Sequence, residues 1–169
     1  MFYFEYPTID TTLYQATPSS STNTGLDEIL EVRKDMNDSG TQIDVSRILM
    51  KFDYSFISKS IQEGTIPSTA KYYLNLYDAQ STELAVEQEL FAYIVSQSWD
   101  GGTGFYSRDP ALSDGASWKY RDNDTTKTEW VSGSLTQGGT WWTGSIGGTA
   151  AEYEVSASYS VVSISGYSK

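Results

Sequence analysis

The sequence predicts an all-β fold, an antiparallel β-sandwich with one short helix, from three stretches of the chain. Residues 10–14 and 25–32 read as extended segments joined by a polar loop. Residues 46–53 follow as a strand that places Ile48, Met50 and Phe52 on one face. A period of two is typical of a strand with one face on a core and the other toward water. Two stacked layers of such strands make a sandwich.

The first elements follow from local patterns. Residues 2–6 alternate as expected of a strand, which Pro7 ends because proline cannot donate a ladder hydrogen bond. A second strand begins near Thr11. Residues 17–25 are dense in turn formers and predict a surface loop, and residues 29–32 are strand-like.

A turn and the only expected helix come next. Asn37-Asp38-Ser39-Gly40 predicts a turn that pairs residues 29–32 in a hairpin with a long strand at 43–54. In residues 55–64, Ile57 and Ile61 lie four positions apart, with Ser55 as candidate N-cap and Gly64 as stop signal. This spacing predicts a short helix.

The rest of the chain is predicted to be strands and long loops. Residues 71–77 alternate, and residues 83–99 combine good helix formers with a period of two, which we interpret as strand. Residues 100–148 are rich in Gly, Trp and small polar residues and predict long loops anchored by aromatic side chains. Residues 153–161 form the most regular alternating strand, with one face toward water.

Size and composition bound the function. The 169 residues fit a single domain over 1–169. The chain has no histidine or cysteine and no recognisable nucleophile motif, so we expect neither enzymatic activity nor a bound cofactor. A net charge of −11 argues against nucleic acid and anionic membranes as partners. The first residues lack a secretory signal, and no window approaches the ~18 apolar residues of a membrane span.

Residues that together match the pattern of a known family are spread over positions 8–162. It comprises Asp10-Thr11, the 25–32 strand, the 46–53 strand, Ile66 with Ala70 before Leu74, Ser98-Trp99, Trp118-Lys119-Tyr120-Arg121, Trp130 and Gly138-Gly139-Thr140-Trp141. This pattern resembles the DNRLRE-type β-sandwich modules of secreted bacterial surface proteins and of tailed-phage structural proteins. The resemblance implies a jelly-roll-like sandwich, which binds polysaccharide in some relatives and serves assembly or attachment in others.

The sequence departs from this family at its end. Family members usually continue with further strands and a closing Asn-Gly segment, whereas this sequence stops at Ser165-Gly166-Tyr167-Ser168-Lys169. We therefore expect an incomplete final sheet, whose unpaired edge a strand from a partner chain completes.

Aromatic residues of the loop-rich half fall into two groups. Trp99, Trp118 and Trp130 match tryptophan positions of the family and are expected to be structural, packing in a loop core. Trp141 and Trp142 are adjacent, so on a strand one of them points away from the core. Together with Tyr106 and Tyr120 they are the candidate ligand-binding residues, for stacking on a sugar or anchoring a protein interface.

Charged residues supply the remaining candidates. Asp109, Asp114, Asp122 and Asp124 are hard oxygen donors that could hold calcium, but they lack EF-hand spacing, and solvated turn carboxylates are the simpler reading. Arg47 lies inside a strand and is expected to be structural, pairing with a carboxylate such as Asp53 or Glu31.

Two functional hypotheses follow. The first is a structural virion protein of a tailed phage, a capsid-decorating, neck or tail-appendage module that assembles in the host cytoplasm with other virion proteins or copies of itself. The second is a carbohydrate-binding module for a surface polysaccharide. The two are compatible, because a virion module can also bind glycans.

Overall fold

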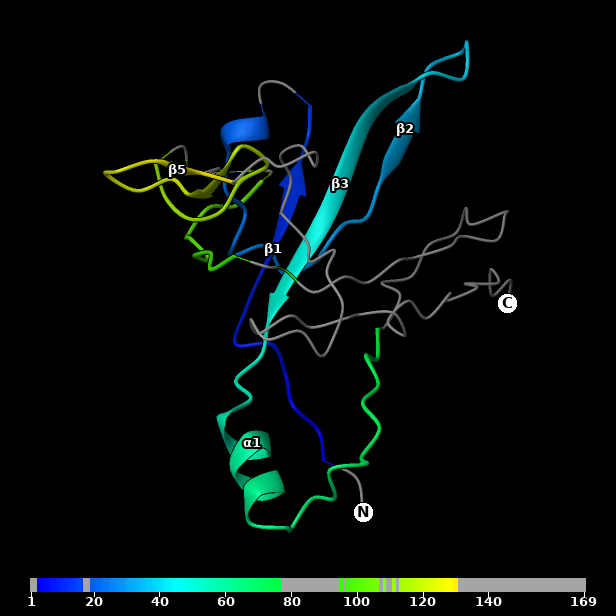
Figure 1. Ribbon diagram of the computed structural model, residues 1–169. Helices are drawn as coiled ribbons and strands as arrows, with labels where there is room; N and C mark the ends of the chain where they lie inside the picture. The colour runs from blue at the N-terminus through cyan, green and yellow to red at the C-terminus, as the bar shows by residue number, and fades with distance from the viewer. Residues whose placement is uncertain are drawn as a thin grey trace.

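The structure is a computed structural model that describes residues 3–16, 19–76, 95, 97–106, 108, 111 and 113–130. Within these ranges the fold is all-β, with antiparallel sheets and one short α-helix, which confirms the predicted class (Figure 1). Its elements are β1 (Ile9–Tyr14), the 3-10 helix η1 (Ser19–Ser21), β2 (Lys34–Met36), β3 (Gln42–Lys51), α1 (Ser55–Gln62), β4 (Tyr120–Asp122) and β5 (Thr128–Glu129). The predicted strand at 153–161 and most of the one at 83–99 lie outside the described residues.

A three-stranded antiparallel sheet in the order β1-β3-β2 is the main layer. Register places Thr11 opposite Leu49 and Leu13 opposite Arg47, so these four side chains share one face. Leu13 is 0% and Leu49 4% exposed, which identifies this face as the inner one. The predicted strand at 43–54 is thus confirmed as β3, although it ends at Lys51.

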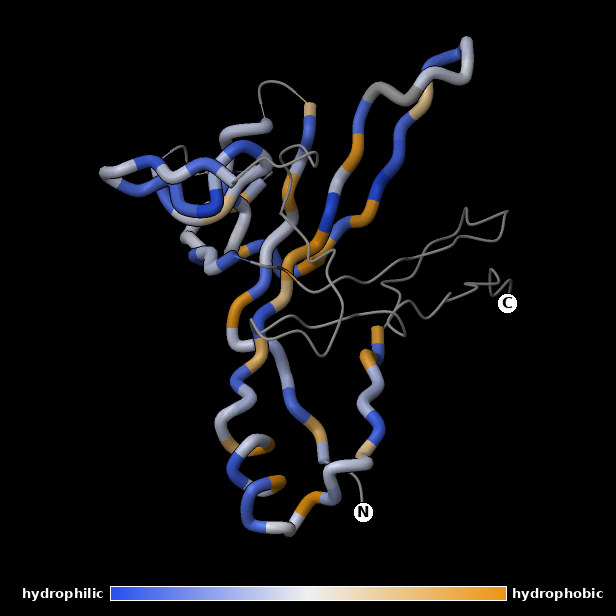
Figure 2. The backbone as a smooth tube through the Cα atoms, in the orientation of Figure 1, coloured by the Kyte–Doolittle hydropathy of each residue, from blue (hydrophilic) through white to orange (hydrophobic). Residues whose placement is uncertain are grey.

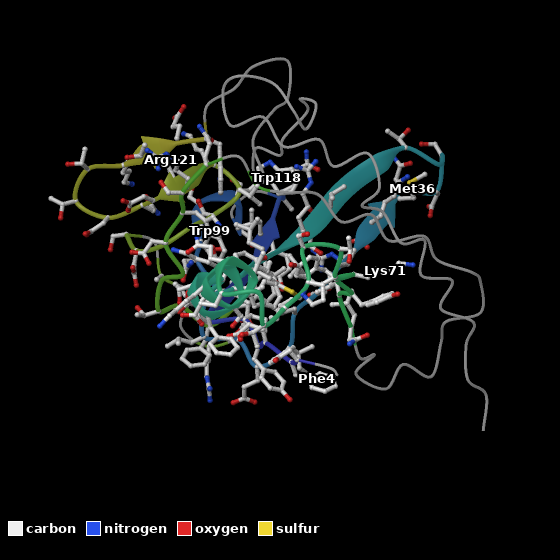
Figure 3. The ribbon with its side chains drawn as sticks, turned by 60° about the horizontal axis from the view of Figure 1, so that its bottom comes forward. Phe4, Met36, Lys71, Trp99, Trp118 and Arg121 are labelled. Atoms are coloured by element: carbon white, nitrogen blue, oxygen red, sulfur yellow. The ribbon has the colours of Figure 1, made fainter. Side chains whose placement is uncertain are left out.

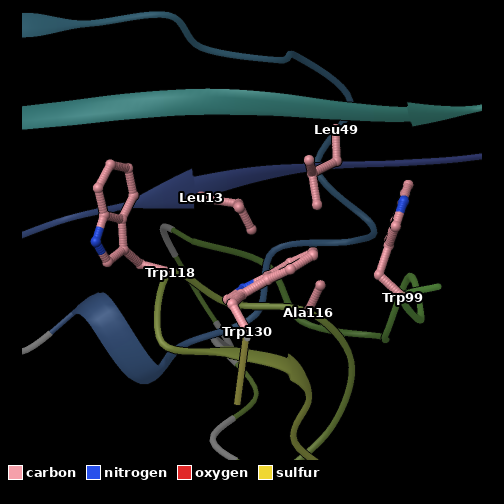
Figure 4. Close-up of a cluster of buried hydrophobic side chains, with 6 residues drawn as sticks. All are labelled: Leu13, Leu49, Trp99, Ala116, Trp118 and Trp130. Carbon is pink, nitrogen blue, oxygen red and sulfur yellow. The ribbon is translucent and has the colours of Figure 1, made fainter. Parts of the chain in front are cut away.

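Loops that carry tryptophan cover that inner face. The buried cluster consists of Leu13, Leu49, Trp99, Ala116, Trp118 and Trp130 (Figure 4). Trp130 donates its indole N–H to the Ser117 carbonyl at 2.9 Å, so the one polar atom of this buried ring is satisfied. The small β4–β5 sheet holds the segment that delivers Trp118 and Trp130 to the cluster.

The β2–β3 hairpin turns as predicted, but its first strand lies further along the chain. The Asn37 Oδ1 accepts hydrogen bonds from the backbone N–H groups of Ser39 (3.1 Å) and Thr41 (2.8 Å). Gly40 has φ +75°, a conformation that favours glycine. Residues 29–32 are not a strand, because the Glu31 N–H bonds the Thr12 hydroxyl at 3.1 Å rather than a ladder carbonyl.

The helix is confirmed at 55–62, with a different cap from the one expected. Tyr54 occupies the N-cap position without a side-chain hydrogen bond, and the Asp53 carboxylate accepts the Ser55 N–H at 2.9 Å. Asp53 precedes the N-cap residue Tyr54, and Ser55 is the first residue of the helix. Ser55 is therefore not the cap. Gly64 ends the segment with φ +74°, as its predicted role requires.

Two short predicted strands are absent. Residues 3–6 and 71–76 alternate in sequence but are irregular in the structure. Phe4 is 73% and Tyr73 76% exposed, and among the described residues no strand pairs with either segment. A period of two in six residues forms a strand only where a partner edge accepts its hydrogen bonds.

Candidate functional site

A buried asparagine joins three loops on the tryptophan side of the sheet. The Asn23 side-chain amide donates to the carbonyls of Gly101 (2.7 Å) and Ala116 (2.8 Å). Its Oδ1 accepts the N–H groups of Gly25 (3.0 Å) and Gly104 (3.1 Å). Asn23 is 0% exposed, and all four of its side-chain bonding positions are used. We call Asn23 with its four partners the Asn23 hub.

Glycine lets the backbones of the Asn23 hub approach this closely. A Cβ on Gly25 would lie 2.0 Å from the Gly101 carbonyl oxygen, and one on Gly104 would lie 2.0 Å from the Asn23 carbonyl oxygen. The predicted surface loop at 17–25 is therefore wrong at its end, because Thr22, Asn23 and Thr24 are buried. The Thr24 hydroxyl, next to Asn23, donates to the Thr12 carbonyl of β1 at 2.9 Å, so hydrogen bonds as well as aromatic packing tie these loops to the sheet.

This rigid frame presents one exposed aromatic ring. Tyr106 stacks on Tyr14, with ring centroids 4.3 Å apart and planes inclined by 26°. The Asp27 carboxylate accepts the Tyr106 N–H through both oxygens, at 3.1 and 3.2 Å. Tyr14 is buried, whereas Tyr106 is 39% exposed. We call this pair the Tyr106 platform, a preordered ring that can stack on a ligand.

Carboxylates surround the Tyr106 platform. The Tyr14 hydroxyl donates to Glu31 at 3.0 Å, and burial together with the Glu31 charge raises the pKa of Tyr14, which keeps it a donor. The Arg33 guanidinium lies 5.6 Å from the Tyr14 ring centroid and pairs with Glu31 (3.5 Å), Asp35 (3.2 Å) and Asp44. One guanidinium thus serves three carboxylates, and this surface is net negative.

A second candidate surface lies around α1. Nine large apolar side chains from the N-terminal segment, the start of α1 and residues 72–76 are 40–79% exposed. They are Tyr3, Phe4, Tyr6, Tyr54, Phe56, Tyr72, Tyr73, Leu74 and Leu76, and we call them the aromatic end. The Tyr3 and Phe56 rings lie 6.1 Å apart and link the first segment to α1. Figures 1 and 2 place these segments at one end of the described chain, and Figure 3 views that end with Phe4 labelled.

A shallow pocket opens beside the Asn23 hub. Its volume is about 280 Å³, near the lower limit for small-molecule sites. It is lined by Pro7, Thr8, Ile9, Asp10, Gly25, Leu26, Asp100, Gly101 and Gly102. Burial raises the pKa of Asp10, because desolvation penalises the charged form of its carboxyl group.

The predicted ligand-binding residues are only partly placed. Trp141 and Trp142 lie outside the described residues. Tyr120 is half-buried in β4, with the ammonium groups of Lys119 and Lys127 lying 5.2 and 5.3 Å from its ring centroid. Among the described residues no ring contact joins Tyr120 to Tyr106. The two tyrosines do not form one platform.

The candidate calcium ligands do not converge where the structure describes them. Asp114 accepts the Thr103 hydroxyl, Asp122 accepts the Asp124 N–H at 3.0 Å, and Asp124 accepts the Thr125 hydroxyl at 3.2 Å. Asp109 lies outside the described residues. In the described ranges no three acidic side chains are placed to hold a metal ion.

The residues predicted to be structural lie on the inner face. Trp99, Trp118 and Trp130 are 9%, 5% and 3% exposed. The Arg47 guanidinium lies 4.6 Å from the Trp118 ring centroid, an attractive cation–π arrangement. Glu31 and Asp53 are the two carboxylates that were expected to pair with Arg47. In the structure Glu31 pairs with Arg33, and Asp53 accepts the Ser55 N–H.

Sequence reasoning missed the Asn23 hub and the aromatic end. An Asn in a run of turn formers reads as an exposed loop residue. The available signal was the spacing of Asn23 and Gly25 against Gly101, Gly102 and Gly104, since clustered glycines mark close backbone approach. The aromatic end was hidden because its alternation was read as strand.

Comparisons with known proteins add no relative. Searches against protein-family models, curated proteins and solved structures give no match. Within the described part of the chain no helix is both long and apolar enough to cross a membrane. The DNRLRE-type resemblance stays a prediction, and functional argument has to start from the two surfaces described above.

Proposed function

We propose that this chain is a structural virion protein of a tailed phage that acts through protein–protein assembly. The observation that carries the proposal is the aromatic end, nine exposed apolar side chains gathered from three segments. Soluble monomers rarely expose contiguous apolar patches larger than a few hundred Å², and larger ones mark interaction sites. Five of the nine residues are tyrosines, a residue type enriched at protein interfaces.

The scaffold suits such a role. The inner face of the sheet is closed by the tryptophan cluster, and the Asn23 hub ties the loops around it to one another. A sheet and loops fixed in this way need no rearrangement when the module associates, which limits the entropic cost to the segments of the aromatic end. A cysteine-free chain also suits assembly in a reducing host cytoplasm.

The phage assignment rests on the DNRLRE-type resemblance and is tested at the particle. An antibody raised against the purified chain should detect it in density-gradient-purified tailed particles from the source culture, at a constant number of copies per particle. A decorating, neck or tail-appendage position would follow from where immunogold label falls. The chain appearing only in the particle-free fraction would exclude a virion component.

A second function, carbohydrate binding, is favoured by the Tyr106 platform. An exposed ring held on a buried one can stack on the apolar face of a sugar, and neighbouring carboxylates can accept hydrogen bonds from the sugar hydroxyl groups. Glu31 and Asp35 are half-exposed beside the Tyr106 platform, as acceptors of this kind should be.

A glycan array tests this second function. Wild type should retain a polysaccharide that the Tyr106→Ala variant releases, with Tyr73→Ala as a matched control at an exposed tyrosine elsewhere. Trp141→Ala and Trp142→Ala extend the test to the other predicted residues. No retained glycan for wild type would leave assembly as the remaining proposal.

A further inference from the structure

The aromatic end differs from the rest of the molecule in charge. The segments that form it, residues 3–8 and 51–76, contain three acidic residues and three lysines. They are Glu5, Asp53 and Glu63, and Lys51, Lys59 and Lys71. The whole chain has 22 acidic and 11 basic residues, so the entire net charge of −11 belongs to the other residues. The most apolar exposed surface is therefore also a neutral one.

This neutrality bears on which partner fits. A basic partner would be drawn to the acidic surfaces, such as the one around Glu31, Asp35 and Asp44, where opposite charges meet. At the aromatic end one lysine is already matched, since Lys59 lies 3.8 Å from Glu63 one helical turn away. An apolar, neutral surface is best covered by another apolar, neutral surface.

We propose that the aromatic end docks on the aromatic end of a second copy of this chain. The inference rests on the assembly function proposed above and names its partner. A two-fold contact uses the same patch on both subunits, so each copy supplies the neutral, apolar surface that the other requires. The segments in contact carry no net charge, so the contact brings no excess of like charge together from two chains of charge −11.

The available area is sufficient. A large aromatic side chain buries ~150–250 Å² when fully covered. Nine side chains that are 40–79% exposed, about 60% on average, therefore supply on the order of 1,000 Å² on each copy. A standard stable interface takes roughly 800 Å² per partner, so the aromatic end is of the size that a dimer needs.

Light scattering of the full chain across a concentration series tests the proposal. Wild type should shift from monomer to dimer as concentration rises. The double variant Phe4→Ser/Tyr6→Ser should weaken dimerisation by at least about tenfold. Both side chains are over 70% exposed in an irregular segment, so their loss should leave the fold intact, which circular dichroism checks.

The matched control is Ile29→Ser, which removes an exposed apolar side chain (64%) outside the aromatic end and should leave dimerisation unchanged. Salt gives a second readout. Raising NaCl from about 0.01 to 0.15 M shortens the screening length from roughly 30 to 8 Å, and should preserve or strengthen a dimer held by neutral surfaces.

Three results would overturn the inference. They are a monomer at every concentration, equal weakening by Ile29→Ser, and dissociation of the dimer on adding salt. A monomeric chain that is still found in purified particles would overturn the second copy as partner while leaving the virion function in place. A chain that dimerises but is absent from purified particles would overturn the virion function while leaving the second copy as partner in place.

Discussion

Asn23 shows how one side chain can organise a loop region that has little regular secondary structure. A primary amide has two donor positions and an acceptor oxygen with two lone pairs, and here each is matched to a backbone group. Hydrogen bonds in a buried site contribute modestly when made but are costly when one partner is removed. The largest effect of the Asn23 hub on stability is therefore expected when Asn23 is removed and its backbone partners lose their hydrogen bonds.

Asn23→Ala should lower the free energy of unfolding by about 3 kcal/mol or more, since it leaves the buried Gly104 N–H, the part-buried Gly25 N–H and two carbonyls without their partner. Urea denaturation followed by tryptophan fluorescence measures the change. The control is Asn37→Ala, which removes bonds in an exposed turn and should cost under about 1 kcal/mol because water replaces them. An equal loss of unfolding free energy in the two variants would mean that the Asn23 hub contributes no more than an exposed turn.

Gly102→Ala and Gly40→Ala form a matched pair, because both glycines have φ +75°. Gly40→Ala meets no atom within 4 Å and should cost about 1–2 kcal/mol from the left-handed backbone alone. On Gly102 the new Cβ would lie 2.3 Å from the Asn23 Oδ1, which adds roughly 1–3 kcal/mol of overpacking. Chemical denaturation of both variants should separate them, and overlapping curves would contradict the close approach.

At the scale of elements, the success of prediction depended on whether a local pattern also had a partner. β3 could be predicted because its alternation coincides with a strand on each side, and α1 because Ile57, Ile61 and Gly64 are local signals. Residues 3–6 have the same alternation but are irregular, and no strand of the described part of the chain pairs with them. Strand formation depends on which distant segments pair with each other, and the local pattern of a single sequence does not specify that pairing.

The candidate surfaces were less accessible to sequence reasoning for a related reason. Tyr106 could be proposed as an exposed aromatic residue, but its stacking on Tyr14 joins positions 92 residues apart. The Asn23 hub likewise joins residues 23, 101, 104 and 116. Such contacts follow from topology rather than from local spacing, so composition could indicate loops anchored by aromatics without indicating which polar residue locks them.

The start of α1 gives a prediction at the element scale. Hydrogen bonds from Ser55 lower the pKa of Asp53 below its ordinary 3.8, so the stabilisation is present above that value and is lost as pH falls through the folded-state pKa. Asp53→Ala should therefore reduce hydrogen-exchange protection in α1 at neutral pH. Once the pH lies below the folded-state pKa of Asp53, wild type and variant should converge. A difference that persists in acid would show that the carboxylate charge is not responsible.

For the whole molecule, uneven charge is the dominant feature. Among the described residues, attraction is concentrated in the Arg33 cluster, where one guanidinium meets three carboxylates, while the chain as a whole carries −11. Added salt weakens both effects, but a half-buried pair such as Arg33 and Asp44 is screened less than exposed charges are. Repulsion among the exposed carboxylates should therefore determine how the free energy of unfolding changes with added salt.

The free energy of unfolding should accordingly rise as NaCl increases from about 0.01 to 0.15 M, because screening relieves self-repulsion in the compact state. Urea denaturation of the Phe4→Ser/Tyr6→Ser variant at low protein concentration measures this without a contribution from self-association. Arg33→Gln serves as the control: it adds to the net negative charge and removes the main attraction, so its stability should increase more steeply with salt. A wild-type stability that falls with salt would mean that ion pairing at Arg33 outweighs the repulsion of the whole chain.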